Sequence, residues 1–157
     1  MLRSPFRLLP ALALALALPL FASAPALAQT AATRSLYDRI GGAPALTAVV
    51  GDFVASAAPD PKVDFTRGGT WIASDAAVFT LKKHLVDFMA QAMGGPKAYT
   101  GRSMKVTHTG MGITQAQFDA LAGHLQAALV KNKVAAADVT AIMKIAASTA
   151  PDIVEKP

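Results

Sequence analysis

The chain has 157 residues, 53% of them apolar, no cysteine and a formal net charge of +5. This size suits one domain with a single core, and the absence of cysteine excludes disulfide cross-links and a cysteine-linked lipid. Without the two arginines of the first 28 residues, the excess of basic over acidic residues falls to three, which is too small and too scattered to predict binding to nucleic acid.

Residues 1–28 have the features of a secretory signal peptide. Two arginines precede an apolar run over residues 8–20, and Ala26-Leu27-Ala28 forms a small-x-small cleavage site. A permanent membrane anchor is the alternative, but the run is short for about 30 Å of hydrocarbon and contains proline. We therefore predict cleavage after Ala28, export to the periplasm, no stable membrane span in the mature chain, and a flexible lead-in over residues 29–34.

Apolar residues recur at helical spacing through the rest of the chain. The first helical stretch covers residues 35–58 and is interrupted at Gly41-Gly42, and residues 60–73 follow as a long irregular loop. A second long helix begins near Ser74, a favourable N-cap, and ends at the turn Gly94-Gly95-Pro96.

The remaining elements are also helical. Residues 102–109 form a short helix, Thr114 caps a strongly amphipathic helix, and a last helix over residues 137–148 is closed by Pro151. No stretch alternates apolar and polar residues as a half-buried strand does. The predicted fold class is therefore all-α, with short helices and glycine-rich connections.

Three histidines without cysteine limit the chemistry available to the chain. His84 borders the apolar face of its helix, His108 lies on the short helix, and His124 falls towards a flank. Zinc requires three or four organised ligands, and carboxylates near the first two histidines are few. A serine hydrolase of the G-x-S-x-G type is excluded because that motif is absent. Haem needs only one strong axial ligand and an apolar pocket. Of these sites, it is the one that three histidines on apolar helices can form most easily.

Four motifs in a fixed order resemble those of the group I truncated haemoglobins. The resemblance covers residues 35–150 and implies a two-over-two helical sandwich around haem b, with residues 151–157 as a C-terminal tail. It is carried by Leu36-Tyr37-Asp38-Arg39-Ile40-Gly41-Gly42, Gly94-Gly95-Pro96, Tyr99-Thr100-Gly101-Arg102-Ser103-Met104-Lys105-Val106-Thr107-His108, and Gly112-Ile113-Thr114 followed by Phe118.

The resemblance implies that His108 is the proximal iron ligand, because it closes the intact Met-Lys-x-x-His pattern. His84 resembles the histidine that takes the sixth coordination site in cyanobacterial members. Donation to a bound gas and contact with a haem propionate are the alternatives for His84. The other implied cofactor contacts are Phe53, Val54, Phe65, Leu81, Lys82, Leu85, Phe88, Tyr99, Met104, Ile113, Phe118 and Leu121.

The distal face departs from the commoner family pattern. Many relatives have Phe-Tyr where this chain has Phe53-Val54, and Leu81 and Leu85 occupy positions that usually lend polar contacts. A hydrogen bond to a charge-polarised ligand stabilises by about 1.5–3 kcal/mol. We therefore expect weak oxygen retention by the usual mechanism, and we expect Trp71 in the loop to cap the pocket.

The leading functional hypothesis is an exported haem protein that binds or transports oxygen, or binds nitric oxide or another diatomic ligand. A closed bis-histidyl site would favour single-electron transfer with a redox partner, or reaction with nitric oxide and peroxide. Two alternatives stay open: a helical binding or scaffold protein that has lost haem, and a haem enzyme that detoxifies nitric oxide or peroxide. A dedicated enzyme is the less favoured interpretation, because it needs a reductant partner.

Overall fold

Every regular element that the computed structural model describes, over residues 34–156, is an α-helix. The predicted signal peptide and residues 29–33 lie outside this range. Within it, no helix is both long enough and apolar enough to cross a membrane. The helices are α2 (Leu36–Arg39), α3 (Gly42–Ala57), α4 (Asp75–Ala92), α5 (Met104–His108), α6 (Gln115–Lys131), α7 (Ala136–Ala147) and α8 (Ala150–Ile153).

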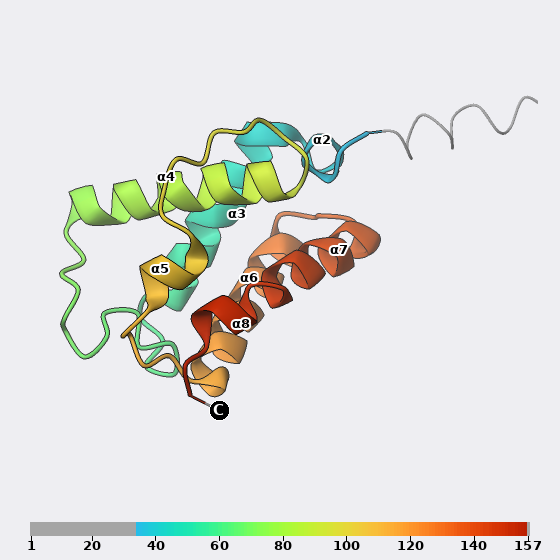
Figure 1. Ribbon diagram of the computed structural model, residues 1–157. Helices are drawn as coiled ribbons and strands as arrows, with labels where there is room; N and C mark the ends of the chain where they lie inside the picture. The colour runs from blue at the N-terminus through green and yellow to red at the C-terminus, as the bar shows by residue number, and fades with distance from the viewer. Residues whose placement is uncertain (1–33, 157) are drawn as a thin grey trace, which may run out of the picture.

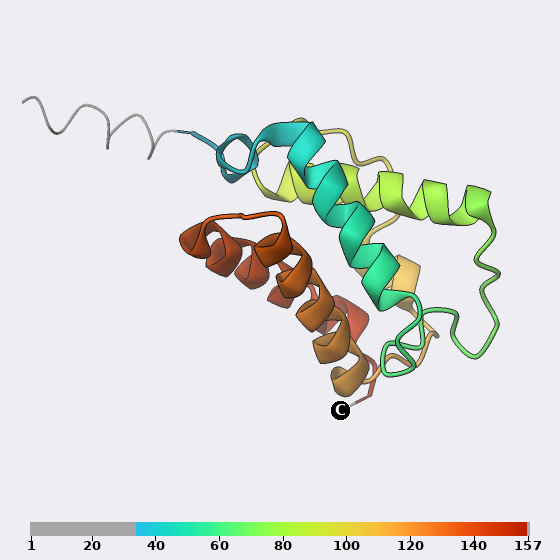
Figure 2. The same cartoon turned by 180° about the vertical axis from the view of Figure 1, so that it is seen from behind.

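Two pairs of helices form the two layers of the molecule, as predicted for a two-over-two sandwich. Helix α3 packs against α4 in one layer, and α6 packs against α7 in the other. Helix α3 also packs against α6 and so joins the layers (Figure 2). The short helices α5 and α8 contact each other beside this frame (Figure 1).

The core lies where α3 crosses its two neighbours. Six residues of α3 are buried, which explains why this helix is apolar over so much of its surface. Leu46 of α3 and Leu129 of α6 are fully buried. Truncation of such a leucine to alanine typically costs about 2–5 kcal/mol, so these contacts dominate the stability of the frame.

The helix starts at Ser74 and Thr114 agree with the sequence analysis, and α5 begins two residues after the predicted start at residue 102. The side-chain oxygens of Ser74, Ser103 and Thr114 accept hydrogen bonds from backbone amides three residues ahead. Gln117 completes a capping box by accepting from the amide of Thr114. Because each cap satisfies an otherwise unpaired amide, these polar residues fix where the helices begin.

The C-terminal end differs from the prediction. Helix α7 ends at Ala147, and Pro151 does not close it but lies in the first turn of the additional helix α8. Proline is favoured there because its missing N–H would have no partner in a first turn. After α8, Lys156 pairs with Thr114 in an isolated bridge, so this end of the chain is fastened to the segment before α6.

The ring of Tyr37, in the motif at residues 36–42, contacts the turn that follows α4. The Tyr37 ring packs over Gly95, where an added Cβ would lie 2.6 Å from the Tyr37 Cγ. The Tyr37 amide also donates to the main-chain oxygen of Met93 at 3.1 Å. Helix α2 therefore packs on the glycine-rich turn after α4. This contact explains why the two motifs, which are distant in the sequence, are found in the same chain.

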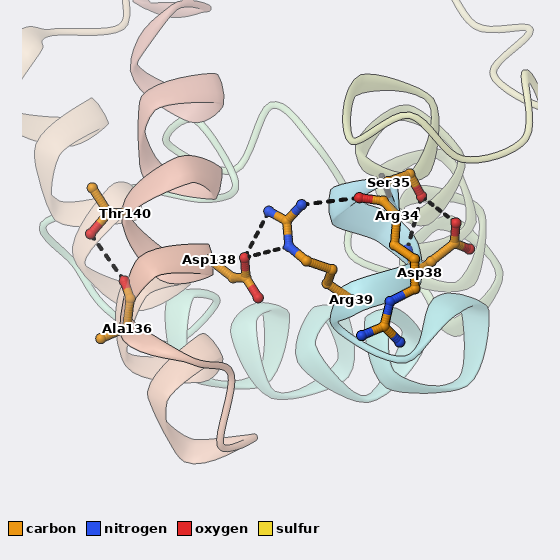
Figure 3. A network of polar contacts seen from close by, with 7 residues as sticks. All are labelled: Arg34, Ser35, Asp38, Arg39, Ala136, Asp138 and Thr140. Carbon is orange, nitrogen blue, oxygen red and sulfur yellow. Dashed lines mark hydrogen bonds and ion pairs between the residues drawn. The ribbon is translucent and has the colours of Figure 1, made fainter. Parts of the chain in front are cut away.

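A polar network fastens α2 to α7 across the two layers (Figure 3). The Arg39 guanidinium contacts one carboxylate oxygen of Asp138 through Nε at 2.9 Å and Nη2 at 2.8 Å. A third nitrogen of Arg39 donates to the main-chain oxygen of Arg34 at 3.1 Å. Planar guanidinium makes several such bonds at once, so Arg39 joins residues far apart in the sequence.

The long loop between α3 and α4 is tied to α6. His124 bonds Asp60 at 2.8 Å, and Arg67 donates to the side-chain oxygen of Gln117 at 3.2 Å. His124 thus connects α6 to this loop. Trp71 does not cap the cavity described below: its ring packs edge-on to Phe65 at 5.7 Å between centroids.

Candidate cofactor site

A cavity of about 460 Å³ opens between α4, α5 and α6 and extends to α7 and α8. Ligand pockets commonly measure about 300–1,000 Å³ and are mostly apolar, as this cavity is. Its polar groups are few and come mainly from α4, α5 and the segment between them. Its lining residues on α3, α4 and α6 are Phe53, Leu81, His84, Leu85, Phe88, Met89, Phe118, Leu121, Ala122 and Leu125.

His108 lines this cavity as the last residue of α5. Its Nδ1 lies 2.7 Å from the main-chain oxygen of Met104, one helical turn earlier. A carbonyl oxygen can only accept, so Nδ1 must carry the proton in this hydrogen bond. In the neutral ring this leaves the lone pair on Nε2, which is the form that binds a metal.

His84 lines the same cavity from α4. Leu81 and Phe88 share its face, because residues three and four apart lie one above another on a helix, and Leu85 lines the cavity beside them. The His84 ring meets the Tyr99 ring edge-on at 6.1 Å between centroids. The structure therefore brings two imidazoles from different helices to one apolar cavity.

The Tyr-Thr-Gly segment before α5 also lines the cavity. Tyr99 also meets Phe88 edge-on at 5.4 Å, and its hydroxyl donates to the main-chain oxygen of Arg102 at 2.7 Å. A Cβ added at Gly101 would lie only 2.5 Å from the Tyr99 ring. Glycine is therefore required there for the tyrosine to fold back over its own turn.

Ten of the predicted contact residues line the cavity. They are Phe53, Leu81, His84, Leu85, Phe88, Tyr99, Met104, His108, Phe118 and Leu121. They come from four helices and one loop, so the resemblance placed residues that helical periodicity alone could not bring together.

Four of the predicted contact residues lie elsewhere. Val54 and Lys82 directly follow cavity residues, and one residue along a helix turns the side chain by about 100°. Val54 is therefore buried in the packing core and Lys82 lies on the flank of α4. Phe65 packs on Trp71 in the loop. Ile113 is buried before α6, where its oxygen accepts from the amides of Glu155 and Lys156.

The sequence analysis missed the far wall of the cavity. Ile142, Ile145 and Ala146 of α7 line it, together with Thr149 and Ile153 at the two ends of α8. The spacing of Ile142 and Ala146 predicted an apolar face on α7, but spacing does not say which neighbour that face meets. Helix α8 is a single turn, which is too short for helical periodicity to predict.

Within residues 34–156, no three His, Cys, Asp or Glu side chains lie close enough together to hold a metal ion. The candidate ligands are instead separate imidazoles on the wall of an apolar cavity. Haem fits this arrangement, because its porphyrin supplies the equatorial nitrogens and the protein needs to supply only one or two axial ligands. The orientation of His108, with Nδ1 engaged and Nε2 available, supports that fit.

Comparison with known proteins agrees with this geometry. The family model for bacterial-like globins matches residues 35–155. A group 1 truncated haemoglobin of Mycolicibacterium paratuberculosis is 40% identical over 119 residues, which are 76% of this chain and 83% of the relative. A second one, from a Nostoc species, is 38% identical over 109 residues, covering 69% of this chain and 87% of the relative.

Solved structures show the same fold. The truncated haemoglobin of Tetrahymena pyriformis in its Fe(III) form superposes with a TM-score of 0.70 at 28% identity, covering 78% of this chain and 100% of that one. The cyanomet haemoglobin of a Synechococcus species, with covalently attached haem, gives a TM-score of 0.67 at 29% identity, with the same coverage of each chain.

Proposed function

The chain belongs to the bacterial-like globin family and, within it, to the group 1 truncated haemoglobins, and from this we propose that it binds haem b between α4 and α5 and takes small diatomic ligands there. The observation that carries the proposal is the orientation of His108 on the wall of an apolar cavity. Family membership favours this function over a helical scaffold that has lost haem.

The residues of the cavity have separate tasks. His108 would hold the haem iron through Nε2, and the Met104 carbonyl holds its ring in one tautomer. Leu81, Leu85 and Phe88 exclude water from the opposite side. When bound, haem supplies an iron that coordinates diatomic ligands and can change its oxidation state.

We propose that His84 closes the sixth coordination site in the absence of an external ligand. It lines the cavity from the helix opposite α5, and it is exposed, held mainly by an edge-on contact with Tyr99. Such a contact contributes roughly 0.5–1.5 kcal/mol, which does not prevent the imidazole from turning inward. Closure would suit electron exchange with a redox partner, or reaction with nitric oxide or peroxide, better than oxygen storage or transport.

We further propose that the protein acts outside the cytoplasm. The support is the charged start, apolar run and small-residue cleavage site of residues 1–28. Fractionation of cells that express the full chain, with N-terminal sequencing of the product, tests this. A mature protein that begins at Gln29 in the periplasmic fraction is expected, and a full-length protein retained in the cytoplasm or membrane would contradict it.

Addition of haem to the purified protein tests the main proposal. We expect a Soret band that saturates at one haem per chain, and a large loss of affinity in His108→Ala. His124→Ala is the matched control, because His124 bonds Asp60 and does not line the cavity. A wild-type protein without a Soret band, or one whose band is unaffected by His108→Ala, would contradict haem binding through His108.

A further inference from the structure

The segment after α8 holds the loop that follows His108. One carboxylate oxygen of Glu155 accepts from the amide of Gly110 at 2.6 Å, and the other accepts from the amide of Gly112 at 2.5 Å. Both glycines have positive φ, 82° and 61°, and their N–H groups bind the two oxygens of the same carboxylate. The loop therefore holds an anion through two backbone amides, and here the anion is a side chain of the same protein.

The backbone of the same segment strengthens this attachment. The amides of Glu155 and Lys156 both donate to the oxygen of Ile113, at 2.8 and 3.1 Å. The amide of Gln115 donates in return to the oxygen of Lys156 at 3.0 Å. The loop between α5 and α6 is therefore held over its whole length by residues about forty positions later in the chain.

The attached loop is continuous with the histidine. The Met111 amide donates to the main-chain oxygen of His108 at 3.1 Å, and Thr109 bonds back to the oxygen of Lys105 at 2.6 Å. Helix α5 has only five residues, and helices so short are unstable without such outside contacts. On the other side, Thr149 and Ile153 of α8 line the cavity that His108 faces.

We propose that Glu155 is a positioning residue for His108: its carboxylate holds the loop from Gly110 to Gly112 and so fixes the end of α5 and the direction of the imidazole. The inference rests on the haem site proposed above and extends it to the C-terminal segment. The same two amide bonds lower the pKa of Glu155, so the carboxylate is charged at neutral pH. The cofactor ligand is thus oriented from two directions, by the Met104 carbonyl within α5 and by Glu155 from the chain end.

Glu155→Gln tests this role, because the side-chain amide retains the size of the side chain but offers one acceptor oxygen where the two loop amides need two. Asp152→Asn is the matched control, since it removes an exposed carboxylate from α8 in the same region. A third protein that ends at Val154 removes the side-chain and backbone attachments together.

The first measurement uses haem-loaded proteins in a His84→Ala background, where the sixth site is open. In the ferrous state we expect Glu155→Gln to shift and broaden the iron–imidazole stretching band in the resonance Raman spectrum. We also expect haem transfer to an excess of an acceptor protein to accelerate by about tenfold, since hydrogen bonds to a charged group have been lost. Asp152→Asn should match its parent in both measurements. An unchanged band in both Glu155→Gln and the truncated protein would overturn the proposal.

The second measurement is made without haem and separates the two hypotheses. Amide hydrogen exchange over residues 104–112 should be faster in Glu155→Gln than in the wild-type protein, while exchange in α3 stays the same. If exchange differs in this way between the two proteins but the wild type gives no Soret band, the haem-site proposal is wrong and the loop attachment by Glu155 is confirmed. If haem binds and exchange over residues 104–112 is the same in the two proteins, Glu155 has no positioning role.

Discussion

The Nδ1 atom of His108 donates to the main-chain oxygen of Met104, which lies 2.7 Å away and one helical turn earlier. Substitution of the Met104 side chain does not remove its main-chain oxygen, so the geometry of α5 fixes the tautomer of His108. The neutral imidazole then keeps its lone pair on Nε2, and the residue lines the apolar cavity.

His84 is expected to control the spin state of the ferric protein. If its imidazole takes the sixth site, the wild-type protein has low-spin absorption bands, and His84→Ala has high-spin bands because only His108 remains. His124→Ala should stay low-spin, since His124 lies on the flank of α6 against Asp60. High-spin spectra in both the wild type and His84→Ala would show that the site is open.

A hydrogen-bond donor introduced beside the cavity should slow the release of oxygen. Leu81 lines the cavity, and Leu81→Gln places an amide where the leucine side chain has only methyl groups. A bond to a polarised ligand stabilises by about 1.5–3 kcal/mol, so the dissociation rate constant should fall by about tenfold or more. Stopped-flow displacement by carbon monoxide measures it, with Leu81→Met as the apolar control. Equal rate constants for the two variants would contradict an apolar distal wall.

Gly95→Ala should destabilise the fold. The added Cβ would lie 2.6 Å from the Tyr37 ring and 2.9 Å from the Ala90 oxygen, so overpacking should lower the free energy of unfolding by about 1–3 kcal/mol. Gly123→Ala is the control, because nothing lies within 4 Å of a Cβ at this exposed helical position. It should raise the free energy of unfolding by about 0.5–1 kcal/mol. Urea denaturation of both variants measures the change in the free energy of unfolding. If only Gly123→Ala were destabilised, this account of the turn would be wrong.

Asp60 should make the stability of the fold dependent on acid pH. The hydrogen bond from His124, and then that from the Lys62 amide, lower the pKa of Asp60 below its ordinary 3.8. A carboxyl with a lowered folded-state pKa stabilises the protein above its unfolded-state pKa, and this stabilisation is lost as the pH falls through the folded value. The wild type should therefore be more stable than Asp60→Asn at neutral pH, and the difference should shrink below pH 3.8.

Urea denaturation at a series of pH values tests this dependence, with Asp152→Asn as a control that removes an exposed carboxylate on α8. The control should follow the wild-type pH profile. If the difference between the wild type and Asp60→Asn were constant from neutral pH to below 3.8, the contact between the loop and α6 would not stabilise the folded state.

The helices could be predicted because their ends carry local signals. Ser74, Ser103 and Thr114 are side-chain caps, and the apolar residues of α3 recur at helical spacing whatever their neighbours are. Helix α8 and the pairing of Lys156 with Thr114 carry no such signal. They depend on contacts between segments about forty residues apart, which periodicity does not contain.

The site was predictable to a similar extent. The motif that ends at His108 placed the candidate ligand and the turn before it, because those residues interact within a few positions of one another. Val54 was assigned to the site because it occupies the tyrosine position of the family's Phe-Tyr pair, but in this structure it is buried in the packing core. Ile142 and Ile153 were missed because only the packing of α7 and α8 brings them to the cavity.

The most direct test is the resonance Raman spectrum of the ferrous protein in the His84→Ala background, with and without His108→Gly. We predict an iron–imidazole stretching band that disappears in His108→Gly and returns when free imidazole is added to fill the space left by the side chain. A band that persists in His108→Gly without added imidazole would show that another residue holds the iron, and would contradict the assignment of His108.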